Sequence, residues 1–66
     1  MITEIGIVAG DIWHILDEQS PVVLKILLQE IDAPRDLILM SLGWLSREGH
    51  VNVTQDYQND FLISLV

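Results

Sequence analysis

Residues 42–51, which read LGWLSREGHV, decide the fold, because a helix ends and a strand begins within them. Gly49 follows the charged residues Arg47 and Glu48, and glycine readily takes the left-handed conformation that closes a helix. From Val51 onward apolar and polar residues alternate, with the period of two that is typical of a strand. The stretch therefore predicts a helix that ends near Glu48, followed by a turn and a strand.

The residues after this stretch complete a hairpin. Val51 and Val53 alternate with polar neighbours, and residues 55–60 are polar and include turn-forming aspartate and asparagine. Apolar side chains then recur at every second position from Phe61 to Leu65. The pattern predicts two antiparallel strands joined by a polar loop.

The first part of the chain predicts an amphipathic helix. Residues 5–18 carry apolar side chains at spacings of three and four, which is the helical period. Pro21 ends this run, because proline forces the residue before it away from helical angles and has no backbone N–H to donate.

Two further helices follow the first one. Residues 22–24 could form a brief strand, and residues 23–31 repeat the helical period. A second break at residues 32–34 also begins the third helix, which we expect to have Pro34 in its first turn and to end at Glu48.

Helix, short strand, helix, tight turn, helix and hairpin is the element order of a winged helix-turn-helix, a fold of the α+β class. The same pattern also fits another small three-helix fold with a β-ribbon. No linker or internal repeat interrupts the order, so we expect residues 1–66 to form a single domain. A domain of this size buries only about 60% of the surface that its unfolded chain exposes.

Two tryptophan-containing motifs carry a resemblance to a known family. The second of them is GWLSRE at residues 43–48. The first consists of Gly6, Ala9, Gly10, Ile12 and Trp13. Over nearly its whole length the chain resembles the short, stand-alone winged helix-turn-helix proteins of bacteria and archaea whose function is unknown. The resemblance implies a winged-helix fold and a DNA-related role, and it supplies no catalytic residue and no ligand.

The charge of the chain departs from what a DNA-binding winged helix would suggest. Ten acidic residues face three basic ones, which gives a formal net charge of −7. Nucleic acids and anionic lipids repel such a chain, because non-specific binding to phosphates draws its affinity from cations. We therefore expect DNA to be a disfavoured partner.

Composition also limits the compartment and the chemistry. The chain has no cysteine, so it forms no disulfide and no thiolate metal site. Its first ten residues lack the basic residue of a signal peptide, and its apolar runs are too short to span a bilayer. We expect a soluble, cytoplasmic protein without membrane contact.

The third helix offers the first candidate interaction surface. The stripe that we expect to pack on the first two helices consists of Ile38, Leu42 and Leu45. Leu39, Met40 and Gly43 lie on the other side, and a contiguous exposed apolar patch commonly marks a protein contact. Reading of bases would instead call for Arg, Lys, Asn, Gln or Ser at such positions.

The last strand offers the second candidate surface. It is apolar on both faces, and one small core can cover only one of them. We assign Phe61, Ile63 and Leu65 to this surface, which a second copy of the chain would cover together with an exposed sheet edge.

The remaining residues of note have ordinary structural interpretations. We expect Trp13 and Trp44 to fill the core or its rim. His14 shares a helix face with Asp11 and Glu18, and we interpret this triple as a solvated face and not as a metal site. No nucleophile with a partner base and no glycine-rich phosphate loop is present, so we expect neither an enzyme nor a cofactor or small-molecule substrate.

Two hypotheses follow from the sequence. In the first, the chain is a non-catalytic module that binds another protein or a second copy of itself. In the alternative, it is a DNA-binding transcriptional regulator that uses the third helix and the hairpin, with Arg35 and Arg47 on phosphates.

Overall fold

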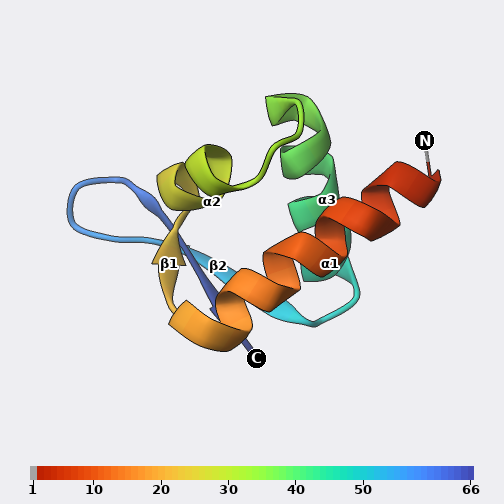
Figure 1. The fold of residues 1–66 in the computed structure, drawn as a ribbon. Coiled ribbons are helices and arrows are strands. Elements are labelled where there is room, and N and C mark those ends of the chain that lie inside the picture. Colours follow the sequence, from red (N-terminus) through yellow and green to blue (C-terminus); the bar gives the residue numbers. More distant parts are fainter. Residues whose placement is uncertain (1) are drawn as a thin grey trace.

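The computed structural model describes residues 2–66 and contains three helices and three strands (Figure 1). The elements, in chain order, are α1 (Ile2–Gln19), β1 (Val22–Val23), α2 (Leu24–Glu30), α3 (Arg35–Arg47), β2 (Val51–Gln55) and β3 (Phe61–Leu65). This order confirms the predicted α+β class, including the brief strand between the first two helices.

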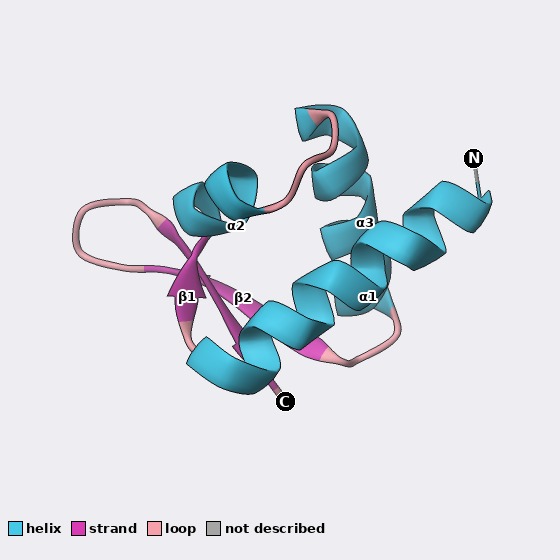
Figure 2. Cartoon of the chain, in the orientation of Figure 1, coloured by secondary structure: helices cyan, strands magenta, loops and turns pink. Residues whose placement is uncertain are grey.

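The strands form one antiparallel sheet in the order β1-β3-β2. β3 lies in the centre, with Val22 opposite Ile63 on one side and Val53 opposite Ile63 on the other. The three helices lie together beside this sheet, and the loop between β2 and β3 extends away from them (Figure 2). β1 and β2 are consequently the two edge strands.

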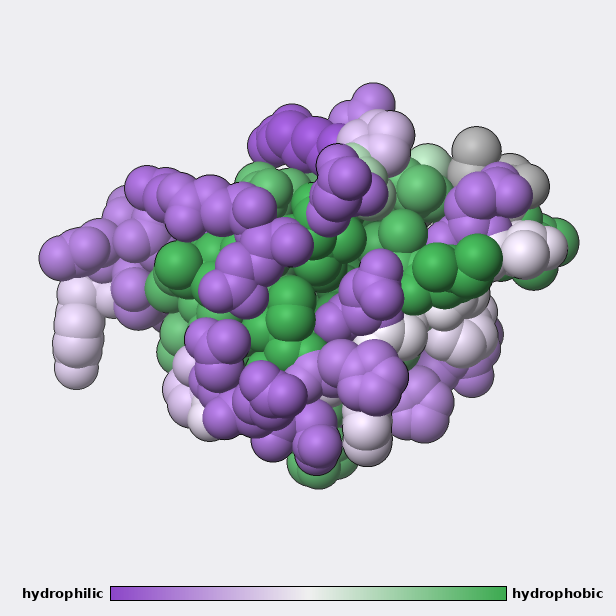
Figure 3. All heavy atoms as spheres, in the orientation of Figure 1, coloured by the Kyte–Doolittle hydropathy of each residue, from purple (hydrophilic) through white to green (hydrophobic). Residues whose placement is uncertain are grey.

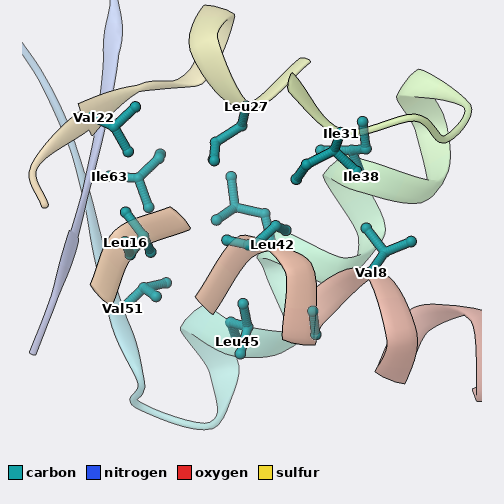
Figure 4. Packing of buried hydrophobic residues seen from close by; sticks show 12 residues of the cluster. Val8, Leu16, Val22, Leu27, Ile31, Ile38, Leu42, Leu45, Val51 and Ile63 are labelled. Atoms are coloured by element: carbon teal, nitrogen blue, oxygen red, sulfur yellow. The ribbon is translucent and has the colours of Figure 1, made fainter. Parts of the chain in front are cut away.

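The core lies between the helices and one face of the sheet (Figure 4). Its twelve buried apolar residues are Val8, Ala9, Ile12, Leu16, Val22, Leu27, Ile31, Ile38, Leu42, Leu45, Val51 and Ile63. The predicted stripe of α3 is confirmed, since all three of its members are in this cluster. Every helix and every strand contributes at least one residue to it, so the core depends on the whole chain.

One buried residue of α3, a serine, is polar. Ser41 is fully buried, and its hydroxyl donates a hydrogen bond of 2.8 Å to the carbonyl oxygen of Leu37 one turn earlier. Because the hydroxyl is satisfied within its own helix, Ser41 can face the core without the cost of an unpaired polar group.

Gly49 ends α3 as the sequence predicts. Its φ is +79°, in the left-handed region. The N–H of Gly49 donates to the carbonyl of Ser46 (3.1 Å), and the N–H of His50 donates to the carbonyl of Leu45 (3.0 Å). This pair of bonds is the Schellman motif, and it turns the chain from α3 into β2.

The helix boundaries differ slightly from the predicted ones. α1 begins at Ile2 and ends at Gln19, so it is longer at both ends than the periodic run. Pro34 has extended angles and is the N-cap of α3, not part of its first turn. Arg35 is therefore the first residue of the helix.

The structure corrects the assignment of the last strand as an interaction surface. Phe61, Ile63 and Leu65 share the face of β3 that is turned toward the helices, because successive side chains in a strand alternate between faces. Ile63 is fully buried and therefore forms no outer surface, whereas Leu65 is half-buried and packs against the core. Only Phe61 of the three is exposed, at 47%.

No helix within residues 2–66 combines the length and the apolar character needed to cross a membrane.

Candidate protein-binding surface

Exposed apolar side chains gather where α1 packs across α3. One hollow of the surface is lined by residues of α1 and α3 and by the histidine that follows α3, namely Gly6, Ala9, Gly10, Trp13, Trp44, Leu45 and His50. A second hollow joins Ile2 and Gly6 to the same Trp44. The helical spacing places Met40 one turn before Trp44 on α3. We call these six residues, Ile2, Gly6, Gly10, Trp13, Met40 and Trp44, the α1–α3 surface.

The large side chains of this surface are open to solvent. The exposed fractions are 88% for Ile2, 42% for Trp13, 46% for Met40 and 46% for Trp44. Hydrophobic and near-neutral atoms reach the surface around the N-terminal half of α1, as one face of the molecule illustrates (Figure 3). None of the six members carries a charged side chain, and exposed apolar residues gathered in this way commonly mark a contact with another molecule.

Neither tryptophan belongs to the buried core cluster, and both are among the exposed large side chains. The Trp13 ring also makes an edge-on contact with the ring of His14, with the centroids 6.3 Å apart. Both indoles therefore keep an exposed side that the chain itself does not cover.

Gly6 and Gly10 form the floor between the exposed side chains. A Cβ atom added at either position would meet nothing within 4 Å, so the fold of the single chain does not require glycine there. Glycine inside a helix costs about 0.5–1 kcal/mol relative to alanine. The two glycines are four residues apart and thus lie on one side of α1, which leaves its backbone open to close approach.

The residues predicted on α3 occupy one side of that helix. Met40 and Gly43 are exposed and Leu39 is half-buried. Met40 joins this side of α3 to the α1–α3 surface, because it lies between Gly43 and Trp44 around the helix.

The two arginines of the DNA-binding alternative lie at opposite ends of α3. Arg35 is its first residue and Arg47 its last, so they are separated by about 18 Å along the axis at 1.5 Å per residue. Asp36 is also exposed on α3. The loop between β2 and β3 holds Asp56 and Asp60 and has no lysine or arginine.

That loop is held by its own aspartate. Oδ1 of Asp56 accepts hydrogen bonds from the N–H of Gln58 (2.8 Å) and of Asp60 (3.0 Å). Asn59 takes the left-handed conformation, with a φ of 64°. The Asp56 carboxylate thus shapes the turn.

The histidine on α1 has acidic neighbours from two elements. His14 and Asp11 of α1 line a hollow with Glu30 of α2 and with Asp32. Among residues 2–66, no group of three or more His, Asp or Glu side chains is placed to hold a metal ion.

Comparison with known families agrees with the architecture. The model of the family described as winged helix-turn-helix domain (DUF2582) matches residues 1–64. The chain belongs to this family. The resemblance that rests on the two tryptophan motifs is thereby confirmed, and the hairpin of β2 and β3 is the wing of a winged helix-turn-helix domain. No curated protein and no solved structure matches the chain.

Met40 is the only member of the α1–α3 surface that the sequence of this winged helix predicted as an interaction residue. Ile2, Gly6, Gly10, Trp13 and Trp44 were not predicted as interaction residues. A signal was available at Gly6 and Gly10, because two glycines four positions apart inside a helical run each carry a cost in helix stability.

Proposed function

We propose that this winged helix-turn-helix domain is a non-catalytic protein-interaction module and that its α1–α3 surface is the binding site. The observation that carries the proposal is the exposure of Trp13, Trp44 and Met40 beside glycines that the single chain does not need. Tryptophan and methionine are typical anchor residues of protein interfaces.

Charge favours a protein partner over nucleic acid. A net charge of −7 opposes binding to phosphates, and α3 carries only two basic residues, Arg35 and Arg47. The wing adds Asp56 and Asp60, which repel phosphates further. The fold itself supports the alternative of a DNA-binding regulator, because many winged helices place their third helix in the major groove.

An NMR titration with DNA tests whether the domain is a protein-interaction module or a DNA-binding regulator. Backbone amide spectra of the labelled domain are recorded with a mixed-sequence duplex at low salt, where electrostatic binding is strongest. We expect no shifts along α3 or the wing. Shifts clustered at residues 34–47 and in the wing, and lost in an Arg47→Ala variant, would overturn the proposal in favour of the regulator.

A further inference from the structure

The α1–α3 surface carries both the projections and the recess that a symmetric contact needs. An interface around a two-fold axis joins the same patch on both copies, so the patch must be complementary to itself. Trp13 and Trp44 project from the surface, and Gly6 and Gly10 form a recess beside them.

We propose that a second copy of this chain covers the α1–α3 surface, with the two α1 helices packed antiparallel and crossing at Gly6 and Gly10. The inference rests on the proposed function and names its partner. At the crossing, the missing side chains let the two helix backbones approach closely, as pairs of small residues four apart do between transmembrane helices. The tryptophans of each copy then fill the hollows of the other.

The charges of α1 favour the antiparallel direction. Asp17 lies on the same side of α1 as Gly6 and Gly10, within about 20° of them at 100° per residue. The last turn of α1 has no basic residue to offset the partial negative charge of the helix C-terminus. In an antiparallel pair Asp17 lies toward the N-terminal end of the partner's α1, which carries partial positive charge. A parallel pair would place Asp17 against Asp17.

The size of the chain also favours a second copy. A standard interface buries about 800 Å² on each partner, which is roughly one sixth of the 4509 Å² that the chain exposes. Oligomerisation is one of the ways in which a domain this small gains stability without disulfides. The α1–α3 surface is apolar and carries no like charges that would repel across a two-fold axis.

Sedimentation equilibrium of the parent chain and of a Gly10→Leu variant tests the proposal. The variant places a side chain where the single chain has free space and replaces glycine by a better helix former, so its fold is retained. We expect a mass of about 15 kDa for the parent, twice the 7.5 kDa of one chain. For Gly10→Leu we expect the monomer mass, with a dissociation constant raised at least about tenfold, equivalent to about 1.4 kcal/mol.

A matched control is Gln29→Leu, which adds the same side chain at an exposed position of α2, away from the surface. It should dimerise like the parent. Circular dichroism and thermal unfolding establish that each variant is folded.

Two results would overturn the dimer. One is a monomer mass for the parent at millimolar concentration, and the other is an undiminished dimer in folded Gly10→Leu. After either result, the broader proposal of a protein-binding module is still tested by the DNA titration, because the outcome of that titration does not depend on the mass. A failure of the dimer and a failure of the protein-binding module are therefore distinguishable.

Discussion

The glycines of this winged helix differ in whether the local backbone conformation requires them. At Gly49 the backbone is left-handed, with a φ of +79°, and the Schellman motif depends on that conformation. At Gly43, in the middle of α3, the backbone is helical and a Cβ would meet nothing within 4 Å. Only the first of these glycines is required by the local structure.

Two alanine substitutions should therefore change stability in opposite directions. Gly49→Ala places an L side chain in the left-handed region and should lower the free energy of unfolding by about 1–2 kcal/mol. Gly43→Ala should raise it by about 0.5–1 kcal/mol through helix propensity. Urea unfolding at one fixed protein concentration measures both. A Gly49→Ala variant as stable as the parent would contradict the structure of this turn.

Ile63 is the residue whose role changed most between sequence and structure. Its exposed fraction is zero, and its side chain points toward Leu16 and Leu27 in the core (Figure 4). Ile63→Ala should thus lower the free energy of unfolding by about 2–5 kcal/mol, the usual range for a large core side chain. Thr54→Ala on the exposed side of β2 is the control and should stay within about 0.5 kcal/mol. A loss of stability in Ile63→Ala as small as that of the control would contradict the burial of this side chain in the core.

At the scale of the elements, the sequence predicted each helix and strand, because periodicity and the breaks at Pro21, Pro34 and Gly49 are local signals. The buried face of β3 could not be predicted in the same way. Both faces of this strand are apolar, so a period of two does not say which face the helices cover. The α1–α3 surface could not be predicted from local patterns either, because only the packing of α1 on α3 brings Gly6 and Trp44 together.

The wing is an element whose conformation depends on one carboxylate. Asp56→Ala removes the acceptor of two backbone N–H groups and should destabilise the loop by about 1 kcal/mol. Amide hydrogen exchange at Gln58 and Asp60 should become faster. Asp56→Asn retains a side-chain oxygen as acceptor and should behave more like the parent. Unchanged exchange in Asp56→Ala would show that the turn does not rely on this side chain.

At the scale of the whole molecule, net charge distinguishes the candidate partners. Two copies at −7 each repel one another at long range, and the same charge would attract a basic partner. The apolar contact between the α1–α3 surfaces has to overcome this repulsion, which dissolved salt screens within a Debye length of about 10 Å at 0.1 M.

Salt should therefore strengthen self-association. Sedimentation at increasing sodium chloride should give a dissociation constant that falls, because screening reduces the repulsion between like-charged copies. Binding to a basic protein or to DNA has the opposite dependence. A dimer that dissociates as salt rises would mean that attraction between charges, and not apolar contact, holds it together.

Tryptophan fluorescence reports directly whether a second copy covers the α1–α3 surface. The chain has only two tryptophans, and both belong to this surface, so the emission reports on it alone. We expect the emission maximum of the parent to move to longer wavelength on dilution from millimolar to nanomolar concentration, because dissociation exposes both indoles to water. In Gly10→Leu the maximum should stay at the longer wavelength throughout. A parent emission that is independent of concentration and matches that of Gly10→Leu would contradict the proposed dimer.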